Sequence, residues 1–286
     1  MDWTSQQGGV RALWAADLPA HAVALAWLGQ AGFALRIGTR RLLIDPYLSD
    51  SLAAKYHGQP FPHTRMMAAP IAPHELCDLD FVLCTHRHSD HMDPGTLPLL
   101  AAANPQCRFI VPAAEIEAAT RAGIPRDRQL PVNAGQHLPL DPAIHLHVLA
   151  AAHEQLQTNE RGEHHYLGFI FELPGLTLYH SGDCVVYAGL AEQLQSHAID
   201  WALLPVNGRD EFRRSHGVPG NMNFSEAAQL CRDARIPALL PHHFGMFDFN
   251  TIPEADLRAA AALLPNPQCL VPAIGLWYLL QPRSRP

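Results

Sequence analysis

The fold and the chemistry of this chain are decided by one short stretch, Thr85-His86-Arg87-His88-Ser89-Asp90-His91-Met92-Asp93. The apolar run before it, Leu79–Cys84, predicts a short buried strand, so the polar cluster leaves the end of a strand. Rigid scaffolds commonly present functional side chains at such ends. Because residues two apart in an extended segment point the same way, His86 and His88 can reach one metal ion together. Asp90 and His91 follow where the chain should turn, and they can face a second ion beside the first.

A solvated turn that is merely rich in histidine is the alternative, because the chain contains 18 histidines. The spacing favours a metal site over that alternative. Neutral imidazole and carboxylate groups suit zinc, and also manganese or iron.

The composition is typical of a globular α/β protein. The chain has 286 residues, of which 48% are apolar, enough for one large domain or two small ones. No internal repeat or low-complexity linker divides it, so we predict a single domain over residues 1–286. The net charge of −7 argues against a nucleic-acid groove, which needs a basic surface.

The six cysteines form no C-x-x-C pair and are interpreted as reduced, buried thiols. No apolar run reaches the roughly 18 residues that a membrane span needs, and the first residues lack the pattern of a secretory signal. We therefore expect a cytoplasmic protein that acts on a small molecule, without a membrane or nucleic-acid partner. A homo-oligomer is compatible with the sequence.

The motif resembles that of the metallo-β-lactamase superfamily. The resemblance implies an α/β fold, a four-layer αβ/βα sandwich of two mixed β-sheets flanked by helices. It also implies three further ligands downstream, each at the end of a strand: a histidine, a bridging aspartate and a last histidine. The sequence offers His153, Asp183 and His243 at these places, after apolar segments at 143–150, 176–179 and 237–240. His180 precedes the turn at Gly182 and is assigned to packing.

Within the superfamily the chain is most similar to the L-ascorbate-6-phosphate lactonase-like group. The matching stretches are Leu28-Gly29-Gln30-Ala31-Gly32-Phe33, Ile44-Asp45-Pro46, Leu178-Tyr179-His180-Ser181-Gly182-Asp183 and Pro241-His242-His243. The chain departs from that group at His153, where those lactonases carry an aspartate. This histidine restores the commoner ligand set of the superfamily.

The resemblance implies a dinuclear hydrolase that uses two divalent metal ions, zinc or manganese with iron as a further option. It assigns His86, His88 and His153 to one ion and Asp90, His91 and His243 to the other, with Asp183 between them. A hydroxide held by the metals would attack a lactone or related ester of a small, anionic substrate. Asp90 and Asp183 are the expected catalytic carboxylates, and Asp90 would also pass a proton to the leaving group.

Other polar residues are weaker candidates for supporting the ligands or binding substrate. Asp45 ends a strand and is either a turn residue or a carboxylate that orients a ligand histidine. Arg209 can clamp an anion or be an ordinary solvated arginine. The remaining candidates are Asn207, His216, Tyr166 and Asn223, and the loop over residues 47–74 is a candidate substrate wall.

Helix starts are predicted at Asn223 and at Thr251, because each is followed three residues later by glutamate, as in a capping box.

Two rival functions remain open. One is a phosphodiesterase or nuclease of the same superfamily, which would need a basic channel. The other is a non-catalytic metal-binding protein, which would be expected to lack part of the ligand set.

Overall fold

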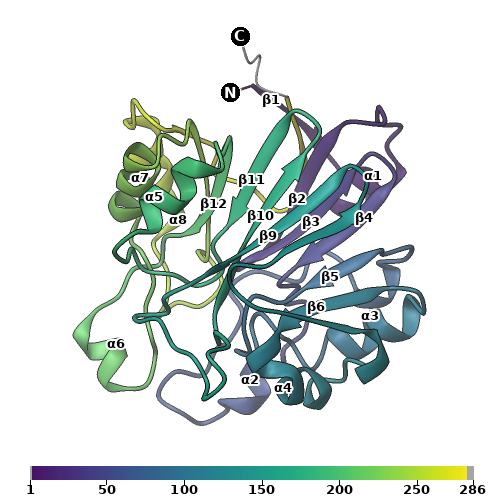
Figure 1. Ribbon diagram of the computed structural model, residues 1–286. Coiled ribbons are helices and arrows are strands. Elements are labelled where there is room, and N and C mark those ends of the chain that lie inside the picture. Colours follow the sequence, from purple (N-terminus) through teal and green to yellow (C-terminus); the bar gives the residue numbers. More distant parts are fainter. Residues whose placement is uncertain (1, 282–286) are drawn as a thin grey trace.

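The structure is a computed structural model that describes residues 2–281. Two mixed β-sheets flanked by helices form the molecule, as predicted (Figure 1). In spatial order, the first sheet contains β1 (Trp3–Gln7), β15 (Leu276–Leu280), β2 (Val23–Gly29), β3 (Gly32–Ile37), β4 (Arg40–Ile44), β5 (Phe81–Leu83), β6 (Arg108–Pro112) and β7 (Gln129–Val132). The second contains β14 (Gln268–Cys269), β13 (Ala238–His242), β12 (Trp201–Pro205), β11 (Leu176–His180), β10 (Leu167–Leu173), β9 (Ile144–Ala150) and β8 (His137–Asp141).

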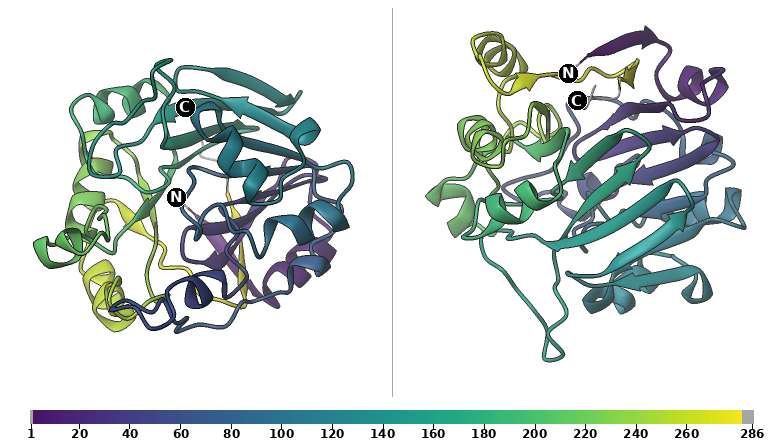
Figure 2. Two further views of the ribbon diagram at one scale, coloured as in Figure 1. Left: turned by 90° about the horizontal axis from the view of Figure 1, so that it is seen from below. Right: turned by 45° about the horizontal axis from the view of Figure 1, so that its top comes forward.

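The α-helices lie outside the sheets, as Figures 1 and 2 show. They are α1 (Gly9–Ala15), α2 (Ser51–Lys55), α3 (Leu97–Ala103), α4 (Ile116–Arg121), α5 (Leu190–Ser196), α6 (Glu211–Ser215), α7 (Phe224–Asp233) and α8 (Glu254–Ala262). Three short 3₁₀ turns are η1 (Pro73–Glu75), η2 (Ala113–Glu115) and η3 (Arg126–Arg128). Within the described residues, no helix is both long and apolar enough to cross a membrane.

Each sheet changes from antiparallel to parallel pairing part-way across. In the first sheet β4, β5, β6 and β7 are parallel neighbours. In the second sheet β11, β12, β13 and β14 are parallel neighbours. Because parallel strands end at the same edge of a sheet, each sheet presents a row of strand exits at one edge. These two rows supply most of the polar residues of the site, and His153 is added after β9.

Strand β2 shows why the central strands read as unbroken apolar runs. Val23, Leu25 and Trp27 belong to the core between the sheets. Ala24 and Leu28 face the other way and pack in the core under the outer helices. Successive strand side chains point to opposite faces, so a strand covered on both sides needs apolar residues at every position.

The core between the sheets provides a stability test. Leu25 is fully buried there, whereas Leu263 is 84% exposed. We expect Leu25→Ala to lower the free energy of unfolding by about 2–5 kcal/mol, because it removes buried surface and leaves a cavity. Leu263→Ala should change it by less than about 0.5 kcal/mol. Urea titration of both variants measures the difference, and equal midpoints would contradict this assignment of the core.

Several short elements escaped sequence analysis. These are β1, α1, β7, β8 and α5, each of four to seven residues. Pro112 ends β6, so α4 begins only at Ile116. The capping box at Asn223 is present, but the one expected at Thr251 is wrong. The Thr251 hydroxyl accepts a hydrogen bond from the Gly245 backbone N–H instead, and Pro253 precedes α8 without a side-chain cap.

Candidate metal centre

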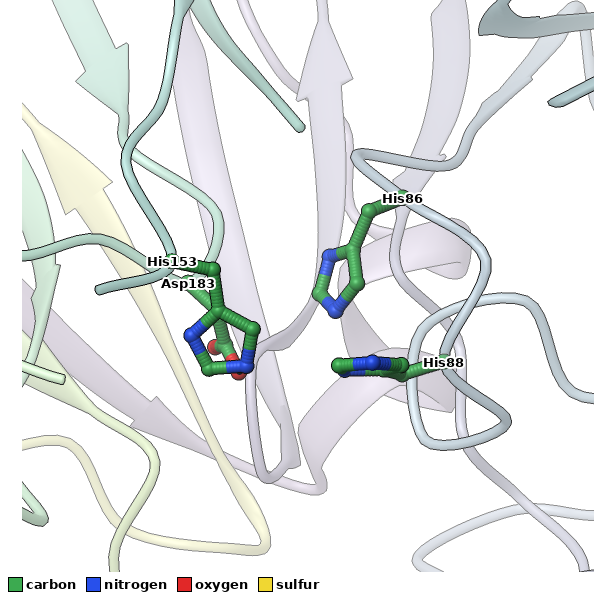
Figure 3. Close-up of side chains that lie close together, drawn as sticks. All are labelled: His86, His88, His153 and Asp183. Atoms are coloured by element: carbon green, nitrogen blue, oxygen red, sulfur yellow. The ribbon is translucent and has the colours of Figure 1, made fainter. Parts of the chain in front are cut away.

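Seven side chains converge where strands of both sheets end. His86, His88, His153 and Asp183 can each offer one ligand atom, and these atoms lie within 4.8 Å of one another, as they do within the second group of Asp90, His91 and His243. Figure 3 shows the first group, in which His153 and Asp183 lie side by side and face His86 and His88.

Asp183 lies between the two groups. Its Oδ1 is 3.3 Å from Nε2 of His91, and its Oδ2 is 3.4 Å from Nε2 of His243. The same Oδ2 is 3.6 Å from Nε2 of His153, which belongs to the first group. The two oxygens of Asp183 therefore face ligand atoms of both groups.

Three of the ligand atoms that face the centre are buried and have no hydrogen bond of normal geometry within residues 2–281. They are Nε2 of His86, Nε2 of His91 and Oδ1 of Asp183. Buried polar groups normally find partners, and unpaired ones are costly. Divalent metal ions would satisfy these atoms, and imidazole and carboxylate are donors that zinc, manganese and iron accept, so the residues present fit such ions.

The opposite ring nitrogens are held by the protein. Nδ1 of His86 lies 3.0 Å from the Thr85 hydroxyl, and Nδ1 of His153 lies 3.2 Å from the carbonyl of Gly220. Nδ1 of His91 lies 2.7 Å from Oδ2 of Asp45. Contacts of this kind fix the ring orientation and the tautomer, and they leave each Nε2 directed at the centre.

The charges in the centre favour metal binding. Burial, together with the neighbouring His91 and His88, lowers the pKa of His86 well below its usual value, and burial lowers the pKa of His153. Burial acts to raise the pKa of Asp183, but His243 and His91 outweigh it and hold that pKa well below normal. Burial acts to lower the pKa of His91, but Asp183, Asp90 and Asp45 outweigh it and raise that pKa well above its usual value. His86, His153 and Asp183 thus have the protonation states that metal ligands need, and His91 would release a proton on binding an ion.

Strained backbone surrounds the centre. Gln30, Asp45 and His243 have φ angles of 50°, 44° and 61°, in the left-handed region that non-glycine residues seldom adopt. Gly182 has φ 61°, and a Cβ there would lie 2.8 Å from the Thr85 side chain, so glycine is required beside Asp183. Such strain persists only where the surrounding structure enforces it.

The chain resembles known proteins in both sequence and fold. Residues 40–244 match the family described as the beta-lactamase superfamily domain. The chain belongs to the metallo-β-lactamase superfamily. It is 28% identical to a UPF0173 metal-dependent hydrolase of Pyrobaculum aerophilum over 235 residues, which cover 82% of this chain and 89% of the relative.

Solved structures share the fold of this chain. Igni18, a metallo hydrolase of Ignicoccus hospitalis, aligns with a TM-score of 0.66 and 18% identity, covering 91% of this chain and 99% of that one. An isothiocyanate hydrolase from Delia radicum gut bacteria aligns with a TM-score of 0.68 and 19% identity, covering 89% and 98%. At these identities the likeness concerns the fold.

A cavity of about 630 Å³ opens over the candidate metal centre. His88, Asp90, His153, Asp183 and His243 lie on its floor. Its walls include residues of α2 and α4, which lie at the same end of the molecule as α6, and part of the 47–74 loop (Figure 1). The loop therefore lines the cavity, as a substrate wall would.

Besides Asp45, which contacts His91, two of the weaker candidates contact the centre or the cavity. The Tyr166 ring packs 5.2 Å from the His86 ring and 5.3 Å from the His153 ring, measured between centroids. It does not line the cavity, so its contact is with the imidazoles. His216 lines the cavity, and its ring packs against Phe61.

Three candidates are engaged elsewhere. The guanidinium of Arg209 donates to both carboxylate oxygens of Glu226, at 2.7 and 2.8 Å, so its charge is paired outside the cavity in this structure. Asn223 caps α7 by accepting a hydrogen bond from the Glu226 backbone. Asn207 is buried and donates to Asn250, so it supports the wall beneath the cavity surface.

Sequence analysis missed Gln30 as a site residue, although it belongs to the Leu28–Phe33 stretch that carries the resemblance. Its side-chain amide donates to Oδ2 of Asp90 at 2.9 Å and lies 3.1 Å from Nε2 of His243. Its backbone carbonyl accepts from the N–H of His243. The sequence feature that could have indicated this role is the position of Gln30 between Gly29 and Gly32, in a turn that joins two strands. Cys184, which directly follows Asp183, is buried and is not among the candidate ligands. Burial raises the pKa of its thiol to about 12.

Asp45 gives a sharp test of how the ligand rings are held. Its carboxylate accepts from the backbone N–H and hydroxyl of Thr85, at 2.7 and 2.6 Å, besides contacting His91. We expect Asp45→Asn to weaken metal affinity about 10- to 100-fold, the usual effect of losing such a supporting contact. Asp80→Asn, which alters a carboxylate bound to Arg40 and the Arg41 backbone, is the matched control. Competition with a metal chelator measures both, and equal affinities would contradict the expectation.

Proposed function

We propose that this chain is a metal-dependent hydrolase that uses two divalent ions to cleave a lactone or related ester of a small, anionic substrate. The observation that carries the proposal is the group of seven convergent side chains, with unpaired buried donor atoms, on the floor of a large cavity. Superfamily membership and the similarity to metal-dependent hydrolases support it.

The ligand roles follow the two groups of side chains. In the proposal His86, His88 and His153 bind one ion, and Asp90, His91 and His243 bind the other. Asp183 contacts both, because its oxygens face members of each group. Zinc or manganese fits this donor set, and iron is also compatible.

The bound ions would lower the pKa of water to about 7 and polarise the oxygen under attack. The chain's own contribution begins with Asp90, which lines the cavity. Burial acts to raise the pKa of Asp90, but His91 and His243 hold it below its usual value, so the carboxylate is ionised. It is placed to take the proton of the attacking water and pass it to the leaving alkoxide. Gln30 keeps this carboxylate oriented through its amide.

The cavity walls favour an anionic substrate with an apolar part. Besides the floor carboxylates, the charged residues that line the cavity are Lys55, Arg87 and Arg121. Tyr56 and Phe247 add aromatic surface to the walls of the same cavity. A small carboxylate or phosphate ester with a hydrocarbon or ring portion matches both features.

Arg121 tests the anionic character of the substrate. Within the described residues it makes no ion pair within 4 Å, and its charge is available to the cavity. We expect Arg121→Glu to raise KM for an anionic substrate about 5- to 10-fold at low salt, with a smaller effect at high salt because exposed charges are screened. The control is Arg11→Glu, which changes an exposed arginine paired with Glu75. An unchanged KM, or the same rise with a neutral substrate, would remove the argument for an anion.

The function itself is tested by a panel of substrates with metal analysis of each protein sample. The panel holds a neutral lactone, an anionic lactone, a phosphodiester, a β-lactam and an isothiocyanate. We expect turnover of the anionic lactone to exceed the others. Preference for the phosphodiester would favour the rival phosphodiesterase, and binding of metal without any turnover would favour a non-catalytic protein.

A further inference from the structure

A second group of histidines lies on the outer face of the second sheet. Ile144, Leu146 and Val148 of β9 are buried in the core, so the alternate residues His145 and His147 point outward. His137 on β8 is the cross-strand partner of His147, and Glu172 on β10 is the partner of His145. Paired residues share a face of the sheet, which brings these side chains together.

Helix α5 adds one more residue to this face. His197 follows the last turn of α5, and its Nδ1 lies 3.8 Å from Oε1 of Glu172. The ring centroids of His197 and His147 are 4.7 Å apart. The group therefore joins two neighbouring strands to the end of a helix.

Three of these residues have the geometry of a ligand set. One ligand atom from each of His147, Glu172 and His197 lies within 4.8 Å of the others. Nε2 of His147 is 3.1 Å from Oε2 of Glu172. Ligand atoms about 2.0–2.2 Å from a tetrahedral zinc ion lie roughly 3.3–3.5 Å from one another, so small side-chain movements would close the set.

The environment also suits a bound ion. Nε2 of His147 is buried, and the carboxylate of Glu172 is the polar group that faces it. A small hollow lined by His147, His197, Gly135 and Ser196 lies beside it and shares no lining residue with the cavity over Asp183. The His137 ring, 4.5 Å from that of His147, is near enough to supply a fourth ligand.

We propose that His147, Glu172 and His197 bind one divalent transition-metal ion, with zinc as the best match, at a site separate from the hydrolytic centre. Two imidazoles and a carboxylate leave at least one position for water or His137. The ion would fasten the end of α5 to β9 and β10, so its binding is expected to stabilise the fold without contributing to hydrolysis.

The test counts zinc in a protein whose main centre has been disabled. In Asp183→Ala protein dialysed against micromolar zinc, elemental analysis should find one zinc more per chain than in the double variant Asp183→Ala/His197→Ala. This difference of one does not depend on how many ions the main centre keeps, so failure of the proposed function leaves the comparison intact. Equal zinc contents in the two proteins would overturn the proposal.

Variants in the otherwise unchanged protein complete the test. Glu172→Gln keeps the shape of the side chain and should lose the same single zinc, while hydrolysis of the best panel substrate stays unchanged. His145→Ala is the matched control, since His145 lies on the same face of β9 but supplies no atom to the group. Added zinc should raise the Tm of Asp183→Ala protein by more than it raises that of the double variant. A zinc content in Glu172→Gln equal to that in His145→Ala would overturn the assignment of Glu172.

Discussion

Asp183→Ala is expected to abolish metal binding at the hydrolytic centre and to lower kcat/KM at least about 1,000-fold. The variant removes a carboxylate whose oxygens face both groups of ligands, at 3.3 Å from Nε2 of His91 in one group and 3.6 Å from Nε2 of His153 in the other. A metal ion supplies several kcal/mol of transition-state stabilisation, and each ~1.4 kcal/mol corresponds to a tenfold rate change. Elemental analysis and steady-state kinetics on the same sample measure the two effects.

The control for this variant is Asp248→Ala, which removes an exposed carboxylate. It should keep both the metal and the activity. Circular dichroism establishes that Asp183→Ala is folded. A folded Asp183→Ala protein with wild-type kcat/KM would show that the bridging carboxylate has no part in the reaction.

Removal of divalent ions with a chelator should eliminate hydrolysis and destabilise the folded protein. The ion-free centre leaves Nε2 of His86 and Oδ1 of Asp183 buried without partners, at a cost to the folded state. At a free metal concentration roughly 1,000 times Kd, binding stabilises the folded state by about 4 kcal/mol, and this is lost on chelation. Activity and Tm, recorded before and after chelation, give both results.

Adding back zinc, manganese or iron separately should restore activity with different efficiencies, which identifies the preferred ion. Magnesium, which favours oxygen ligands over imidazole, is the matched negative control. Full activity in a sample shown to contain no divalent ion would reject the metal-dependent chemistry.

The ligand cluster could be located from the sequence because its members follow strands with strong apolar patterns. The segment at 143–150 alternates apolar residues with His145 and His147, and it leads directly to His153. The exits at Asp183 and His243 follow equally apolar strands. The superfamily's ligand order then linked residues that lie up to 157 positions apart, since 243 − 86 = 157.

The residues that line the cavity were harder to predict from the sequence, because they come from loops and short helices with little hydrophobic periodicity. Arg209 follows a strand exit as a ligand would, but the capping Glu226 of α7 draws its guanidinium away. Lys55 and Arg121 line the cavity from α2 and α4, and the spacing of the sequence gives no sign that these helices meet. Gln30 was missed because amides are seldom metal ligands, and its role is visible only once Asp90 and His243 lie beside it.

Short elements were overlooked for a related reason. Strand β7 contains Pro131, which argues against a strand, and its edge position in the sheet makes that proline acceptable. Strand β8 is only partly buried and also lies at an edge, so its apolar pattern is weak. Edge position is a property of the assembled sheet and cannot be inferred from a five-residue window.

Anomalous diffraction from crystals grown with the restoring metal tests the central claim most directly. The account predicts two peaks about 3.5–4 Å apart within the seven-residue cluster, with Asp183 in contact with both. An electron-density map that shows the seven side chains ordered but holds no metal peak among them, in crystals of active protein, would contradict it.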